Sequence, residues 1–158
     1  MVQQVRAELT RLLGLRAPKE ELAEQIYQHH HLRRESFLAE FHQLVTSLIE
    51  PEFIVFRDWV SERGVACYVL QHDDASAPHH LAFISFGVGA PADACMAKSD
   101  LVRVQADAIR REVVTAHFKA GDRAGVSTDE ASFYLTEITP ALLRGHLLRV
   151  MAPYYGGR

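Results

Sequence analysis

The residues with the most potential for chemistry are the histidines and aspartates of one short loop. His72, Asp73, Asp74, His79 and His80 surround a polar connection between two apolar segments. Neutral imidazole and carboxylate groups are good ligands for zinc, iron or manganese. If the two segments pair as strands, the hairpin brings His72 and His80 towards each other. The sequence therefore offers a metal site, whose candidate ligands are His72, Asp74, His79 and His80.

The spacing of these side chains matches no established metal motif, since neither His-Glu-x-x-His nor paired Cys-x-x-Cys is present. The competing interpretation is a solvated loop whose histidines are incidental. The same applies to His29-His30-His31, because successive helical side chains point about 100° apart and cannot all bind one ion. A metal centre would instead place at least three candidate ligands within binding distance of one point, from among His72, Asp73, Asp74, His79, His80 and His117.

A second candidate site is a ligand-binding turn at Gly87 and Gly89, expected between a strand and a helix. Backbone N–H groups at such a junction can hold a phosphate, helped by the helix dipole. Pro91 donates no N–H, and the simpler interpretation is a tight turn. The expected order of elements is similar to that of acetyl-coenzyme A-dependent N-acyltransferases, which implies acyl transfer at Gly87–Pro91. The Arg/Gln-x-x-Gly-x-Gly/Ala loop of that family is absent here.

The two cysteines, Cys67 and Cys95, offer possible nucleophiles beside a histidine base. Cys67 is expected in a strand, where a small core residue is the simpler interpretation. Cys95 is expected near a helix start, the better environment for a reactive thiolate. Two cysteines do not make a disulfide framework, so we expect a reduced, cytoplasmic setting.

Length and composition indicate a single globular domain. The 158 residues can bury a core of their own, and 48% hydrophobic with 23% charged residues is a usual globular balance. The formal net charge of −3 argues against broad nucleic-acid binding. The helix expected over residues 36–50 would read DNA in a winged-helix protein, but it contains no lysine or arginine. No run approaches the roughly 20 apolar residues that span a bilayer, so no membrane span is expected.

The elements that must position these residues form an α+β fold, in the order α-α-α-β-β-β-α-β-α, with a mainly antiparallel sheet covered by helices. Apolar periodicity predicts helices over residues 2–13, from 18, 36–50, 99–119 and from 140. Runs of β-branched and aromatic residues predict a three-stranded meander and a fourth strand, over residues 53–60, 65–72, 81–88 and 132–138. The N-terminal part, 1–50, is thus helical and the part 51–158 is mixed.

Particular residues mark the ends of the predicted helices. Gly14 and Pro18 separate the first two, and Pro51 ends the third. The second and third can also be one continuous rod, because no glycine or proline separates them. Thr139 caps the last helix, and Pro140 takes its first position.

The longest predicted helix runs from a cap at Ser99 to a stop at Lys119 and Gly121. Asp107 and Arg111 would form an i,i+4 ion pair on its surface. Its apolar stripe consists of Val102, Ala106, Ile109, Val113 and His117.

The sequence favours a small cytoplasmic, non-catalytic regulatory or protein-interaction protein. The reason is that every candidate catalytic group has a simpler structural interpretation. The apolar faces of the meander and the aromatic tail at Tyr154 and Tyr155 favour an interface, so we expect a homodimer or a protein partner. The alternatives are a metal-binding enzyme or sensor that uses the His72–His80 loop, and acyltransferase-like ligand binding at Gly87–Pro91.

Overall fold

A computed structural model describes residues 2–76, 80–89, 99–120 and 127–155 of the chain. It confirms the expected α+β class, with helices before and after an antiparallel sheet. The chain divides into two compact units, residues 1–36 and 37–158, which are described separately. The second unit holds the sheet, the core and the candidate metal centre.

Helix α1 runs without a break from Val2 to Leu44. The expected break at Gly14 and Pro18 is therefore wrong, whereas the continuous rod over the second and third predicted helices is confirmed. A proline inside a helix costs about 3 kcal/mol and a glycine about 1 kcal/mol relative to alanine. The helix-forming residues on both sides outweigh these two local penalties.

The chain leaves α1 through one π-helical turn, Val45–Ile49, and enters α2, Glu50–Ser61. Pro51 has no N–H, so it starts a helix here instead of ending one. The Glu50 N–H bonds back to the Val45 carbonyl, which widens the turn. The strand predicted over residues 53–60 is wrong, because Phe53 and Val60 are buried at a helical spacing. The aromatic and β-branched residues of this segment contribute to packing from a helix instead of a strand. Strand propensity depends strongly on the packing context.

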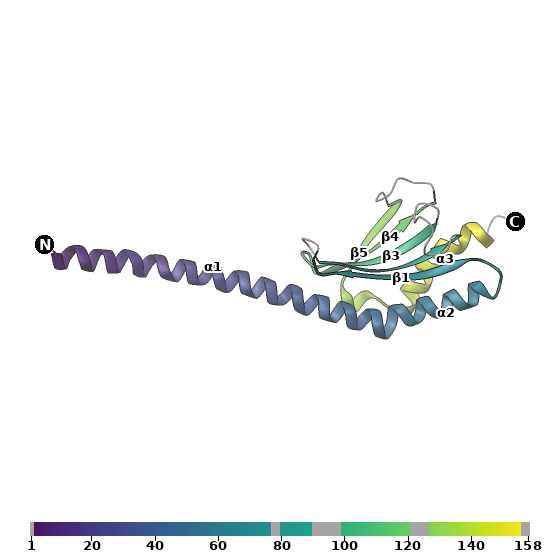
Figure 1. Ribbon diagram of the computed structural model, residues 1–158, viewed down its shortest axis with the longest axis horizontal. Helices are drawn as coiled ribbons and strands as arrows, with labels where there is room; N and C mark the ends of the chain where they lie inside the picture. Colours follow the sequence, from purple (N-terminus) through teal and green to yellow (C-terminus); the bar gives the residue numbers. More distant parts are fainter. Residues whose placement is uncertain (1, 77–79, 90–98, 121–126, 156–158) are drawn as a thin grey trace. The chain divides into compact units, whose positions relative to one another are not determined.

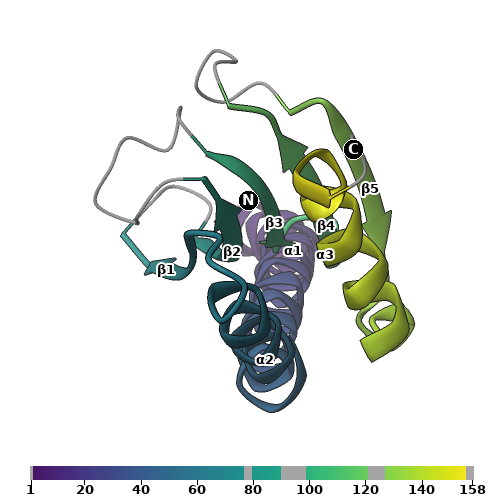
Figure 2. The same cartoon turned by 90° about the vertical axis from the view of Figure 1, so that its right-hand side faces the viewer.

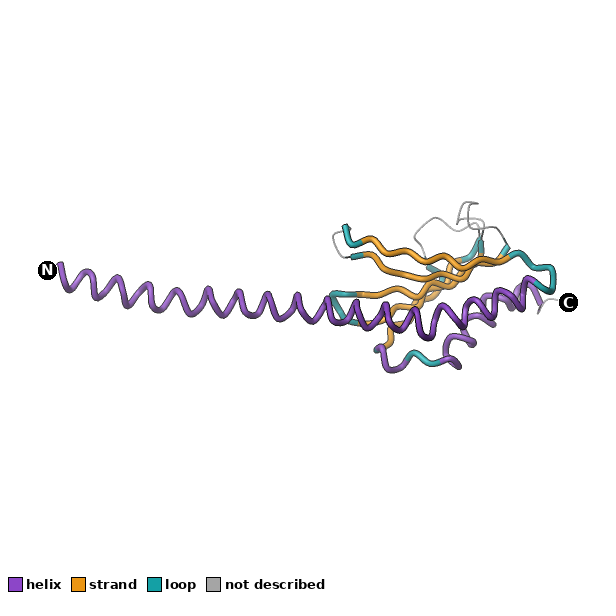
Figure 3. Tube along the Cα trace, turned by 60° about the horizontal axis from the view of Figure 1, so that its bottom comes forward, coloured by secondary structure: helices purple, strands orange, loops and turns teal. Residues whose placement is uncertain are grey.

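The sheet is a five-stranded antiparallel meander in sequence order, drawn as one orange layer in Figure 3. Its first two strands, β1 (Cys67–Asp74) and β2 (Leu81–Val88), confirm the strands predicted at 65–72 and 81–88. The segment expected as the longest helix forms two further strands, β3 (Asp100–Asp107) and β4 (Glu112–Phe118). The last strand, β5 (Asp129–Phe133), lies earlier than the predicted 132–138 and pairs with β4 in the same chain.

A tight turn explains why the helix prediction over residues 99–119 is wrong. The Asp107 carboxylate accepts the backbone N–H groups of Ile109 and Arg110, at 3.1 and 3.0 Å, which is a side-chain-stabilised turn. Arg111 follows with a φ of +56°, so the chain reverses instead of continuing as a helix. Asp107 and Arg111 therefore flank a hairpin turn and are not an i,i+4 helix pair.

Helices α2 and α3 (Pro140–Tyr155) lie side by side on one face of the sheet (Figures 1 and 2). Thr139 caps α3 as predicted, since its hydroxyl accepts the Leu142 N–H at 3.2 Å. The helix continues through the segment expected as a tail, as far as Tyr155. The core between helices and sheet includes Phe41, Ile49, Phe53, Ile84, Phe86, Val102, Val104, Leu143 and Leu147.

Candidate metal centre

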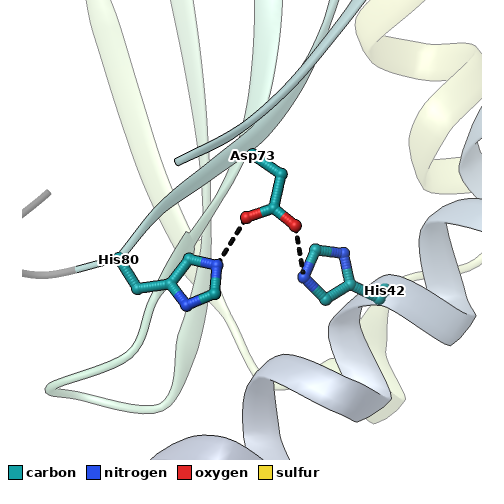
Figure 4. Close-up of side chains that lie close together, drawn as sticks. All are labelled: His42, Asp73 and His80. Carbon is teal, nitrogen blue, oxygen red and sulfur yellow. Dashed lines mark hydrogen bonds and ion pairs between the residues drawn. The ribbon is translucent and has the colours of Figure 1, made fainter. Parts of the chain in front are cut away.

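Three side chains from separate elements of the second unit meet near the end of the β1–β2 hairpin (Figure 4). His42 lies in the last turn of α1, Asp73 is near the end of β1, and His80 comes just before β2. The Asp73 carboxylate lies between the two imidazoles. One of its oxygens is 3.2 Å from His42 Nε2, and the other is 2.5 Å from His80 Nε2.

The strand register explains why Asp73 reaches the helix. Cross-strand pairing places Asp73 beside Ala82, which is part of the core between the sheet and the helices. Side chains two residues apart share a face, so Asp73 points to the same side as Val69. His42 follows the buried Phe41, whose ring meets its imidazole edge-on at 6.2 Å. Because the buried Phe41 fixes this turn of the helix against the core, the adjacent His42 is held beside the end of the strand.

His80 has an unusual backbone, with a φ of +38°. This left-handed region is sparsely used by residues other than glycine, although histidine tolerates it better than most. Such a conformation costs on the order of 1–3 kcal/mol and persists only where its surroundings hold it. The contact with Asp73 is one interaction that fixes the His80 ring. The residue with the strained backbone is therefore also a member of the cluster.

The donor set suits a divalent transition metal. One ligand atom from each residue can be chosen so that all three lie within 4.8 Å of one another. Ligands bound tetrahedrally at about 2.1 Å are about 3.4 Å apart, so a modest inward movement would complete the site. Two imidazoles and one carboxylate are donors used by zinc, iron and related metals. Three protein ligands leave at least one coordination position for water or another molecule.

Without an ion, the same geometry is a hydrogen-bonded chain in which both imidazoles donate to one carboxylate. The side chains of His42, Asp73 and His80 are 36%, 45% and 28% exposed, so an ion from solution could reach them. An exposed hydrogen bond of this kind contributes little to stability. A metal would replace the two donated protons and bind all three groups at once.

The structure divides the ligands that the sequence singled out. His72 lies on the opposite face of β1 from Asp73, where its ring stacks on Phe83 at 5.0 Å. Asp74 shares that opposite face, and its carboxylate accepts the N–H and hydroxyl of Ser76. His79 is outside the described residues. Of the three predicted metal ligands that the structure describes, only His80 lies in the cluster, and Asp73 takes the carboxylate position.

His42 is the ligand that sequence reasoning missed. It is remote in sequence from the loop and was expected only as one residue of a helix. A signal was present in its position beside the buried Phe41, because a polar residue next to a core position lies at the edge of the interface. Its partner depends on the placement of α1 against the sheet, which the sequence pattern does not give.

The two glycines of the second candidate site are already engaged. Gly87 lies inside the sheet, and a Cβ built there would be 2.2 Å from Cζ of Tyr68. The Gly89 N–H donates to the Ala66 carbonyl at 2.9 Å, and the Tyr154 hydroxyl donates to the neighbouring Val88 carbonyl. Gly89 has a φ of +98°, which suits glycine at a chain turn. Residues 90 and 91 are outside the described residues.

Comparisons with protein-family models, with curated proteins and with solved structures found no match. Among the described residues, no helix is both long and apolar enough to cross a membrane. Cys67 is a free thiol, bonded to the Arg57 carbonyl and to the Ser61 hydroxyl at 3.3 Å each, as expected for a packing residue.

A second polar cluster lies between β4 and α3. His117 Nε2 and His146 Nδ1 are 2.8 Å apart, so one ring nitrogen donates and the other accepts. Burial, reinforced by the positive charge of Arg149, lowers the pKa of His117 to about 4 and also lowers the pKa of His146. Both rings are neutral near pH 7. Because His117 is only 7% exposed, this pair is a satisfied polar contact inside the core.

Proposed function

We propose that this chain is a metal-responsive regulatory protein that binds a divalent transition-metal ion through His42, Asp73 and His80. The observation that carries the proposal is the convergence of two imidazoles and one carboxylate from three elements that are distant in sequence. The set has the two-histidine, one-carboxylate composition used for such ions in proteins. The metal sensor at the β1–β2 hairpin was one of the alternatives that the sequence offered. The proposed ligands now include His42 and Asp73 beside His80.

The arrangement of the ligands favours a regulatory role. His42 belongs to α1, whereas Asp73 and His80 belong to the two sides of one hairpin. An ion bound to all three would tie the helix end to the hairpin. Because the ligands are partly exposed, the ion can exchange with solution, so occupancy would follow the concentration of free metal. Metal binding would in this way set the rigidity of the hairpin.

The experiment is calorimetric titration of metal-free full-length protein, prepared without a histidine tag, with Zn²⁺ and separately with Mn²⁺. The proposal predicts one ion per chain. Replacing one ligand, as in His42→Ala, Asp73→Ala or His80→Ala, should weaken binding by about 100-fold or more, because even an indirect supporting residue is worth about 10–100-fold.

Two matched variants serve as controls. His72→Ala removes a loop histidine on the opposite face, and His31→Ala removes a histidine of α1 that pairs with Glu35. Both should leave the affinity unchanged within about twofold. Retained binding in all three ligand variants, or loss of binding in His72→Ala alone, would reject the proposed ligand set.

A further inference from the structure

The two edges of the sheet differ in how well they are protected. Proteins usually protect an edge strand by making it short or by placing charges, lysine or proline on it. The edge strand β5 spans five residues and begins with the carboxylates Asp129 and Glu130. The other edge strand, β1, spans eight residues and contains neither lysine nor proline. It forms the side of the sheet away from α3 (Figure 2). The β1 edge is therefore the one built to accept another strand.

The strand register shows which backbone groups of β1 point outward. The Gly89 N–H donates to the Ala66 carbonyl at 2.9 Å, and these two residues continue the β1–β2 register. Hydrogen-bonded positions alternate along an antiparallel pair, so the even-numbered residues of β1 direct their backbone groups to β2. The outward-facing residues are Cys67, Val69, Gln71 and Asp73. Among the residues that the structure describes, none outside the sheet forms a backbone hydrogen bond with these four.

This outward pattern is complementary to itself. A second β1 can lie antiparallel beside the first, with the two copies of Leu70 opposite each other. Val69 then faces Gln71 of the second copy, and Cys67 faces Asp73 of the second copy. Both members of each pair point outward, so each pair can exchange two hydrogen bonds. A single register therefore satisfies every outward N–H and C=O group of the strand.

The carboxylates of β1 favour the same antiparallel arrangement. Asp73 and Asp74 both lie at the end of the strand. In the antiparallel register each Asp73 is six residues, or about 20 Å, from its counterpart along the strand direction. A parallel pair in register would instead place like charges side by side, which is destabilising. The half-buried Leu70 meets its counterpart at the centre, which removes more apolar surface from water.

We infer that β1 pairs with β1 of a second copy of the chain, as an antiparallel strand pair with a two-fold axis between the two copies of Leu70. The five strands of each copy then form one continuous sheet. Such an interface uses the same surface on both partners. A second copy is preferred to another partner because the strand satisfies its own outward groups and keeps its acidic ends apart.

The first test is the molar mass of the full chain in solution, measured by light scattering during size exclusion. The unsubstituted protein should be a dimer at micromolar concentration, with or without EDTA, which keeps this result separate from metal binding. Gln71→Pro removes an outward N–H and leaves the bonds to β2 in place. It should raise the dimer dissociation constant by about 100-fold or more, because two hydrogen bonds are lost and the ring occupies their place.

Matched variants separate loss of pairing from loss of folding. Gln71→Thr keeps the N–H and should remain dimeric, and thermal unfolding followed by circular dichroism checks that Gln71→Pro is folded. Leu70→Lys places two like charges opposite each other at the axis and should also dissociate the dimer. Leu70→Thr introduces no charge and should remain dimeric.

Disulfide formation tests the register, in a chain whose two natural cysteines are replaced by serine. Leu70→Cys should cross-link to itself, because residues opposite each other at such a position have Cα atoms about 4.5 Å apart. His72→Cys is more exposed but should not cross-link to itself, since its counterpart is four residues, or about 14 Å, away along the strand direction.

Two results would overturn the inference. One is a monomeric unsubstituted protein at micromolar concentration, and the other is a dimer that survives both Gln71→Pro and Leu70→Lys. Efficient cross-linking of His72→Cys to itself, with none for Leu70→Cys, would overturn the register.

Discussion

The Asp73 carboxylate lies 3.2 Å from the His42 ring, so the end of a strand contacts a helix turn that is far from it in sequence. His80 completes the group from the other side of the same hairpin. This convergence produces a two-histidine, one-carboxylate set.

Metal binding should stabilise the folded protein. An ion present at about 100 times its dissociation constant contributes about 2.7 kcal/mol, which raises the Tm of a domain of this size by roughly 5–10 °C. We expect Zn²⁺ to produce this increase in the unsubstituted protein and not in His80→Ala. Thermal unfolding followed by circular dichroism measures it. An equal increase in His80→Ala would place the stabilising ion elsewhere.

Acid should destabilise the protein through His117. Burial lowers the pKa of His117 to about 4, whereas an unfolded histidine has a pKa near 6.5. As the pH falls through 6.5, the unfolded state takes up the proton first, so the stabilising contribution is present above pH 6.5 and is lost towards pH 4. His146, whose pKa is also lowered, acts in the same direction.

The measurement is the urea midpoint at pH 7.5 and pH 5. The drop between the two pH values should be smaller in His117→Gln than in the unsubstituted protein. His72→Gln, a substitution on the other face of the sheet, should retain the full drop. If His117→Gln and the unsubstituted protein lose the same stability, His117 does not carry the pH dependence.

The Tyr68 hydroxyl is buried and has no hydrogen-bond partner among the residues that the structure describes, and Tyr68 is only 6% exposed. An unsatisfied buried hydroxyl costs about 1–3 kcal/mol. Tyr68→Phe should therefore be neutral or raise the free energy of unfolding by up to about 1 kcal/mol, whereas most core substitutions lower it. Chemical unfolding compares the two. A loss above about 1 kcal/mol would mean that the hydroxyl is bonded in solution.

Gly87 has no room for a side chain beneath the Tyr68 ring. A Cβ built there would be 2.2 Å from Cζ and 2.4 Å from Cε1 of Tyr68. Gly87→Ala should lower the free energy of unfolding by about 1–3 kcal/mol through overpacking. Adding Tyr68→Phe should not restore stability, because the ring atoms remain, whereas Tyr68→Leu should restore part of it. Equal effects of the two second substitutions would contradict the clash.

The fold was partly predictable from the sequence. The patterns at 65–72 and 81–88, and the cap at Thr139, are local signals, and the structure confirms them. The expected helix over 99–119 is wrong, yet its stripe grouped residues that do share a face. Val102 pairs with His117 and Ala106 with Val113 across two strands. A hairpin with a short turn reproduces such a grouping, so periodicity alone could not separate the two structures.

The candidate site was less predictable for a physical reason. The loop supplied Asp73 and His80, but strand alternation sends His72 and Asp74 to the opposite face of β1. Residues that are neighbours in the chain therefore look like one group in the sequence, although the strand places their side chains on opposite faces. His42 enters only through packing of α1 on the sheet, which is a long-range contact.

A crystal structure of the zinc-loaded protein, with anomalous diffraction data at the zinc absorption edge, would locate the bound ion. We expect one strong anomalous peak bounded by His42, Asp73 and His80, within about 2.0–2.2 Å of their ligand atoms. A peak at His29–His31 or at His72, or no ordered peak in the loaded protein, would contradict it.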